Sequence, residues 1–128
     1  MATPRPIPPW AAGEREWVVM NYDGKRFRKV TADPAADAPV ARYHQSGDLV
    51  WAEFAGGDVR RGSLAGTCAA DGTVSFAYSM VLTSGEVVSG SSVNTPRVLA
   101  DGRIRFHEEW ERYGPHAATG VSSIEEVR

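Results

Sequence analysis

The 128-residue chain contains a single cysteine, Cys68, and no long hydrophobic run. One cysteine cannot form an internal disulfide, so nothing in the sequence suggests an oxidising compartment. We expect Cys68 to fill a small buried gap rather than to act as a nucleophile, because no catalytic motif surrounds it. No apolar stretch approaches the ~20 residues of a membrane helix, and the N-terminus lacks a signal-peptide core. These absences predict a cytoplasmic protein with no membrane partner.

Positive charge is not in excess either, since 14 lysines and arginines face 16 aspartates and glutamates. Nucleic-acid binding depends on clustered positive charge, so we expect no nucleic-acid partner. The basic cluster Lys25, Arg26, Arg28 and Lys29 favours a solvated surface over a phosphate site. A chain of this length can form one hydrophobic core but not two. Its 13 glycines and its preference for arginine over lysine are typical of GC-rich bacterial genomes.

No segment shows the periodicity of an amphipathic helix. Instead, short segments alternate between apolar and polar residues. Turn-forming pairs such as Asp23-Gly24, Asp71-Gly72 and Asp101-Gly102 separate these segments. Turns at intervals of about 10 to 17 residues are typical of an antiparallel meander. The expected strands are residues 16–22, 26–31 continued by 41–45 after an interrupting loop, 49–55, 59–67, 73–83, 86–93, 102–113 and 120–127.

About eight strands joined by hairpins predict an all-β, up-and-down barrel, because closure removes exposed edges. A flattened sandwich is the alternative. A barrel of this size holds its own side chains or one small ligand. Proline is dense in residues 1–13, where we expect an extended arm or a disordered tail, and residues 14–128 should form the single barrel domain. Pro96 marks a bulge or a strand edge.

The most informative segment is residues 102–113, GRIRFHEEWERY. Strand alternation places Ile104, Phe106, Glu108 and Trp110 on one face, with charged neighbours on the other. A carboxylate within an apolar stripe is costly unless it is paired, hydrogen-bonded or protonated. Glu108 therefore has two open interpretations. It is either a structural carboxylate satisfied by arginine or backbone donors, or an acid/base group or ligand anchor in a cavity.

Other candidate site residues come from the same alternation. Tyr78 is the polar member of the apolar face of strand 73–83, and Arg112 could lie at the mouth of the barrel. In strand 49–55 the register is open, because either Val50 or Trp51 could face the interior. The candidate catalytic residues are Glu108 and Tyr78, and the candidate ligand-binding residues are Phe76, Met80, Phe106, Trp110, Arg112 and, in the reversed register, Trp51.

The segment His107-Glu108-Glu109-Trp110-Glu111 is one histidine short of the zinc motif H-E-x-x-H. Glu111 replaces the second histidine, and positions i and i+4 of a strand are too far apart to chelate one ion. The chain also has no phosphate-binding loop and no dinucleotide fingerprint. We therefore expect neither a metal nor a cofactor.

Seven short motifs are NYDGK at 21–25, FR at 27–28, GG at 56–57, TP at 95–96, GRIR at 102–105, HEEW at 107–110 and IEE at 124–126. Together they resemble a family of small bacterial proteins with avidin-like or lipocalin-like barrels, and the resemblance spans residues 17–126. It implies a barrel of the calycin type. Members are sometimes labelled N-acetylglutamate synthase, but the chain has no acetyl-CoA cradle and no mixed α/β pattern. The similarity to true avidins is architectural, and biotin binding does not carry over because the tryptophan-rich biotin pocket has no match.

Three functions stay open. The first is the binding of a small, partly apolar molecule in the barrel, with Glu108 as polar anchor. The second is a cofactor-independent cyclase or isomerase in which Glu108 and Tyr78 transfer protons. The third is a structural or oligomerising barrel without a pocket. A homodimer is compatible with each of them.

Overall fold

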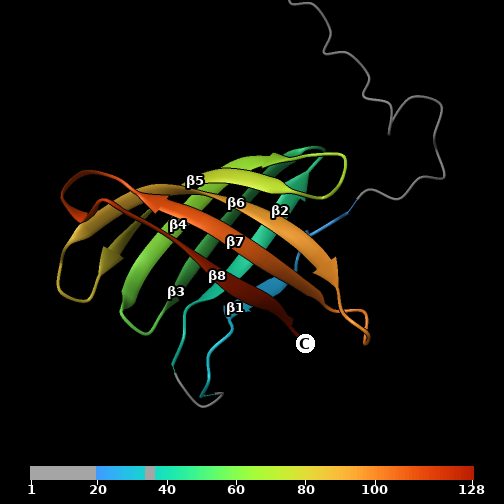
Figure 1. Cartoon of the computed structure of the whole chain (residues 1–128), viewed down its shortest axis with the longest axis horizontal. Coiled ribbons are helices and arrows are strands. Elements are labelled where there is room, and N and C mark those ends of the chain that lie inside the picture. The colour runs from blue at the N-terminus through green and yellow to red at the C-terminus, as the bar shows by residue number, and fades with distance from the viewer. Residues whose placement is uncertain (1–19, 34–36) are drawn as a thin grey trace, which may run out of the picture.

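Each strand of the protein pairs with its neighbours in sequence, and the last strand pairs with the first. The computed structural model describes residues 20–33 and 37–128, and Figure 1 shows the resulting closed antiparallel barrel. The all-β meander predicted from the turns is confirmed, and the sandwich alternative is wrong. The strands are β1 (Arg26–Lys29), β2 (Val40–Ser46), β3 (Leu49–Gly56), β4 (Val59–Cys68), β5 (Val74–Leu82), β6 (Val87–Val98), β7 (Ile104–Arg112) and β8 (Ala118–Val127), with a 3-10 turn η1 (Gly114–His116) before β8.

The first two strands differ from the sequence-based prediction. The residues from Met20 to Tyr22 are not a strand, while residues 16–19 and the expected arm at 1–13 lie outside the described residues. Strands β1 and β2 are not one interrupted strand but an antiparallel pair, in which Phe27 lies opposite Ala41. The proline-bearing segment between them is therefore a connection that reverses the chain. The strand count is preserved because β1 takes the place of the expected first strand.

Two turns determine where Glu108 lies among its neighbours. At the β6–β7 turn, the Leu99 N–H donates to the carbonyl of Arg103 at 2.7 Å, and Gly102 adopts a φ of 88° that favours glycine. After β7, η1 reverses the chain into β8. Glu108 is consequently opposite Asn94 on β6 and opposite Ser122 on β8.

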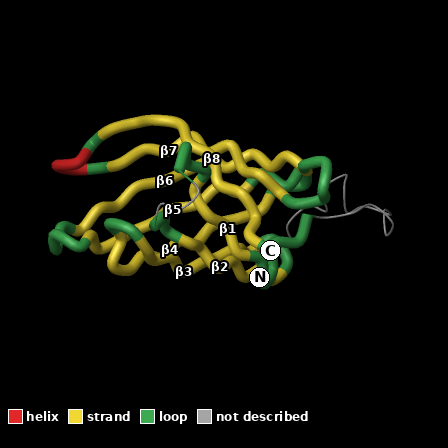
Figure 2. The backbone as a smooth tube through the Cα atoms, turned by 90° about the horizontal axis from the view of Figure 1, so that it is seen from below, coloured by secondary structure: helices red, strands yellow, loops and turns green. Residues whose placement is uncertain are grey.

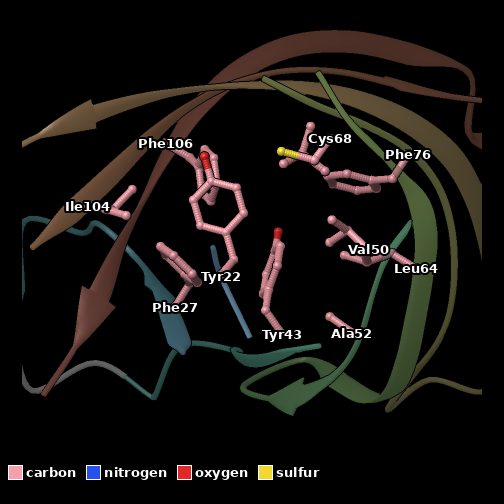
Figure 3. Packing of buried hydrophobic residues seen from close by; sticks show 11 residues of the cluster. Tyr22, Phe27, Tyr43, Val50, Ala52, Leu64, Cys68, Phe76, Ile104 and Phe106 are labelled. Atoms are coloured by element: carbon pink, nitrogen blue, oxygen red, sulfur yellow. The ribbon is translucent and has the colours of Figure 1, made fainter. Parts of the chain in front are cut away.

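One end of the barrel is filled by aromatic and aliphatic side chains. Figure 3 shows the side chains of Phe27, Tyr43 and Phe106, from β1, β2 and β7, pointing toward one another and toward Tyr22, which precedes β1. The rings of Phe27 and Tyr43 have centroids 4.9 Å apart, and those of Phe27 and Phe106 are 5.0 Å apart. Such pairs add to the free energy of burial through edge and offset contacts. We call this the closed end.

The opposite end, which we call the mouth, carries η1 and the β1–β2, β3–β4 and β5–β6 connections. The C-terminus lies at the closed end, away from η1 (Figure 2). Pro96 lies on β6 beyond Asn94, where the pairing with β5 ends, and it pairs only with Phe106 of β7. The strand-edge prediction for Pro96 is confirmed, since a residue without an N–H is tolerated where one neighbour is missing.

Candidate ligand-binding cavity

The half of the barrel toward the mouth encloses a cavity of about 240 Å³. All eight strands contribute to its wall. Its floor is formed by Phe27, Tyr43, Leu64 and Phe76, which belong to both the cavity wall and the closed-end core. The volume lies just below the ~300–1,000 Å³ of typical ligand pockets. The cavity therefore suits one small molecule.

A chain of hydrogen bonds crosses the inner wall over β6, β7 and β8. Ser122 donates from Oγ to Oε1 of Glu108 at 2.9 Å, and Asn94 donates from Nδ2 to Oε2 at 2.8 Å. Ser92 in turn donates from Oγ to Oδ1 of Asn94 at 2.6 Å. Within the described part of the chain, no lysine, arginine or histidine forms an ion pair with Glu108. We call these four residues the polar cluster.

Tyr43 adjoins the polar cluster from β2. Its side chain is almost completely buried, and burial is the main reason that its pKa is raised well above the usual range. The charge of Glu108 raises this pKa further, whereas a hydrogen bond with Asn94 opposes the shift. The Tyr43 hydroxyl is therefore protonated at neutral pH. Figure 3 shows it directed into the barrel.

Cationic side chains lie nearer the mouth. The guanidinium of Arg112 lies over the ring of Trp110, 5.4 Å from the centroid, in cation–π geometry. The hydroxyl of Tyr78 donates to the backbone carbonyl of Glu111 at 3.4 Å. Burial raises the pKa of Tyr78, and Arg112 acts in the opposite direction. Lys29 also reaches the cavity wall, so this member of the basic cluster is not simply part of an outward surface.

Glycines behind aromatic rings keep the cavity open. Gly120 lies opposite Trp110 in the β7–β8 register, and a Cβ at Gly120 would be 2.4 Å from that ring. Gly62 lies opposite Phe54 in the same way, with a ring atom 2.3 Å from the would-be Cβ. Each ring therefore lies against the barrel wall and does not project to the centre. Gly90 lies opposite Tyr78, and a Cβ at Gly90 would be 2.8 Å from Cζ of that ring.

Most of the residues selected from sequence alternation meet at this cavity. Glu108 and Trp110 face inward while Glu109 is exposed, so the predicted face of β7 is confirmed. The cavity wall also contains Phe76, Tyr78, Met80 and Arg112.

Two of the predicted ligand contacts lie elsewhere. Phe106 is completely buried in the closed-end core and does not line the cavity. Trp51 is on the outer surface, where its ring stacks on His44 with centroids 5.4 Å apart. The reversed register of strand 49–55 is wrong, because Val50 and Ala52 fill the interior and the side chain between them must point outward.

The partners of Glu108 were not foreseen. Ser92, Asn94 and Ser122 are small polar residues in strands without an apolar stripe, so alternation alone does not mark them. The positions of the turns in the sequence could have identified these partners of Glu108. Glu108 is seven residues from Asp101 and Asn94 is seven residues on the other side, so a turn centred on Asp101 pairs them. The same counting about Pro115 pairs Glu108 with Ser122.

Among residues 20–33 and 37–128, no group of three or more histidine, cysteine or carboxylate side chains is arranged to hold a metal ion. Cys68 is a free thiol in the core, as the gap-filling prediction required. None of the helical segments in this part of the chain could span a membrane.

An eight-stranded meander closed into a barrel with an internal cavity defines a calycin-type protein. The model of the avidin-like protein family matches residues 20–127, so the chain belongs to that family, as the sequence motifs predicted. No curated protein matches the chain. No solved structure matches it.

Proposed function

We propose that the protein binds a small, partly apolar molecule in the barrel cavity and that Glu108 is the polar anchor. The observation that carries this proposal is the Glu108 carboxylate, held by two neutral donors in a cavity with otherwise mainly apolar walls. Removing a carboxylate from water is costly when no cation compensates it. A ligand that contacts the carboxylate would offset that cost. Polar groups fixed by neighbouring hydrogen bonds are also suited to orienting a ligand.

The two other candidate functions have less support. Acid–base catalysis by Glu108 and Tyr78 requires both groups at one substrate, but the Tyr78 hydroxyl donates to the Glu111 carbonyl near the mouth. A purely structural barrel without a pocket does not account for the cavity or for the glycines behind its aromatic walls.

Equilibrium dialysis against a bacterial metabolite extract tests the proposal, with mass spectrometry identifying compounds enriched on the protein side. Ser122→Phe places a ring in the cavity and should abolish enrichment. Val121→Phe is the matched control, because Val121 is the adjacent residue on the outer surface and is 66% exposed. Circular dichroism establishes that both variants fold.

The wild type and Val121→Phe should enrich the same compounds, and Ser122→Phe should enrich none of them. The proposal fails if the wild type enriches nothing, or if the folded Ser122→Phe protein enriches the same compounds as the wild type.

A further inference from the structure

We infer that the ligand is a small zwitterion whose cationic end meets Glu108 deep in the cavity and whose anionic end meets Arg112 at the mouth. Its apolar body would lie along Trp110. This inference rests on the proposed function and specifies the chemistry of the ligand. It follows from the hydrogen-bond capacity of the polar cluster and from the order of side chains along β7.

The hydrogen-bond donors of the polar cluster are engaged in hydrogen bonds, whereas some of its acceptor sites are free. Ser122 and Ser92 each have one hydroxyl hydrogen, and both hydrogens are donated within the cluster. Asn94 donates to Glu108 and also forms a hydrogen bond with Tyr43. An ionised carboxylate has about four acceptor sites, of which Ser122 and Asn94 occupy two. The serine oxygens and Glu108 thus present lone pairs, and a ligand group that meets these atoms must bring N–H or O–H donors.

The charge at this position favours a cationic donor. No described basic side chain forms an ion pair with Glu108, so its negative charge is balanced only by hydrogen bonds from neutral groups. Hydrogen bonds between ionised partners are roughly twice as strong as those between neutral partners. Partial exclusion of water strengthens the attraction further. An anionic head group would be repelled at the same place.

The order of inward-facing residues on β7 indicates where the anionic end of the ligand lies. Glu108, Trp110 and Arg112 are successive inward positions, so an acid, an aromatic ring and a base follow one another from the interior to the mouth. Four residues of strand span ~13 Å of backbone. The Arg112 guanidinium folds over the Trp110 ring, which brings its charge back along β7 toward Glu108. Lys29 adds a second cation to the wall.

A zwitterion of matching length satisfies both ends at once. A purely apolar ligand would leave Glu108 further desolvated without compensation. A ligand with only one charge would satisfy one end of the cavity. The arrangement therefore selects a molecule with opposite charges separated by one small apolar unit.

The test uses three probes of one shape. The zwitterion is 4-(aminomethyl)benzoate, benzylamine lacks its carboxylate, and 4-methylbenzoate lacks its amine. Isothermal titration calorimetry with the full-length wild type should give the tightest binding for 4-(aminomethyl)benzoate, with at least tenfold weaker binding for either singly charged probe. This comparison needs no variant.

Two variants then identify which side chain contacts each charged end of the ligand. Glu108→Gln should weaken binding of 4-(aminomethyl)benzoate at least tenfold and should not weaken 4-methylbenzoate. Arg112→Gln should weaken 4-(aminomethyl)benzoate and 4-methylbenzoate but not benzylamine. Glu109→Gln is the control for charge, because Glu109 is the exposed neighbour, and it should bind all three probes as the wild type does.

The inference is overturned if 4-methylbenzoate or benzylamine binds the wild type as tightly as the zwitterion, or if none of the three binds. It is also overturned if the compounds enriched by dialysis lack either charge. These outcomes are distinct from failure of the proposed function, in which dialysis enriches no compound at all.

Discussion

Tyr22 precedes β1 and is completely buried at the closed end of the barrel. Its hydroxyl donates to the carbonyl of Gly72 in the β4–β5 connection at 2.6 Å, across 50 residues of sequence. Tyr22 also packs against Phe106, with ring centroids 4.9 Å apart. A single side chain thus joins the start of the described barrel to two distant elements.

Tyr22→Phe should lower the free energy of unfolding by about 1–2 kcal/mol, because the buried Gly72 carbonyl loses its partner. Urea unfolding followed by circular dichroism measures the change. Tyr113→Phe is the matched control, since Tyr113 is 47% exposed, and it should change stability by no more than about 0.5 kcal/mol. Equal effects of the two substitutions would contradict this role for Tyr22.

The pH dependence of the free energy of unfolding should reflect the burial of Tyr22. Burial, followed by the charges of Cys68 and Asp71, raises the pKa of Tyr22 above its usual range. The folded protein therefore holds this proton more tightly than the unfolded chain does. The stabilisation is complete below the unfolded pKa of about 10 and is lost as pH rises above it. Unfolding at about pH 9 and 11 should show a smaller loss of stability for Tyr22→Phe than for the wild type, and equal losses would exclude Tyr22 as a contributor.

At this scale the sequence predicted an inward Glu108 and an outward Glu109, because the two lie in a stripe with clear apolar neighbours. It did not predict what satisfies Glu108. Asn94 and Ser122 come from neighbouring strands, and identifying them requires the pairing register as well as the residue type. The alternative in which Trp51 faces inward was wrong for a related reason. Both faces of β3 carry apolar side chains, so alternation alone does not show which face is buried.

Among the elements, the pairing of β7 with β8 shapes the cavity wall. The Trp110 ring lies over Gly120, which has no side chain to displace it. A methyl group at Gly120 would overlap the far edge of this ring. The ring must then turn toward the cavity or the strands must separate.

Gly120→Ala should therefore move the Trp110 indole and reduce stability by about 1–3 kcal/mol. Two-dimensional NMR of the indole N–H resonance and urea unfolding measure the two effects. Val121→Ala, on the outer face of the same strand, should leave the Trp110 resonance unchanged. An unshifted Trp110 resonance in Gly120→Ala would show that the ring does not lie over Gly120.

The long strands could be predicted because strong turn pairs bound them. Strand β1 lies within the expected strand 26–31, but its four residues are too few for alternation to show where it ends or which strand it pairs with. The connection after it contains Pro34 and Pro39, which suit either an interruption or a reversal of direction. Only the pairing of Phe27 with Ala41 distinguishes these alternatives.

For the molecule as a whole, closure of β8 onto β1 depends on a buried carboxylate. Glu126 is 7% exposed, and it accepts hydrogen bonds from the Ile104 N–H at 3.1 Å and from Lys25 Nζ at 3.2 Å. It therefore connects the start of β7 and the segment before β1 to the end of β8. The barrel seam is fixed by these contacts as well as by backbone pairing.

Glu126→Ala should destabilise the protein by about 1–3 kcal/mol, because the Ile104 N–H is left buried without an acceptor. Hydrogen exchange should increase most along β1 and β8, where the seam opens. Glu109→Ala, at an exposed position, should change stability by no more than about 0.5 kcal/mol. A Glu126→Ala protein as stable as Glu109→Ala would contradict the account of the seam.

The central claim is that the barrel interior is the binding site, and its two described tryptophans test this directly. Trp110 lines the cavity, whereas Trp51 is 37% exposed on the outer surface. ¹⁵N-labelled protein would be titrated with a compound recovered by dialysis while both indole resonances and the Asn94 side-chain amide are followed. We predict saturable shifts of the Trp110 and Asn94 signals and none of the Trp51 signal. A shift of Trp51 with Trp110 and Asn94 unchanged would place the ligand on the outer surface and contradict the account.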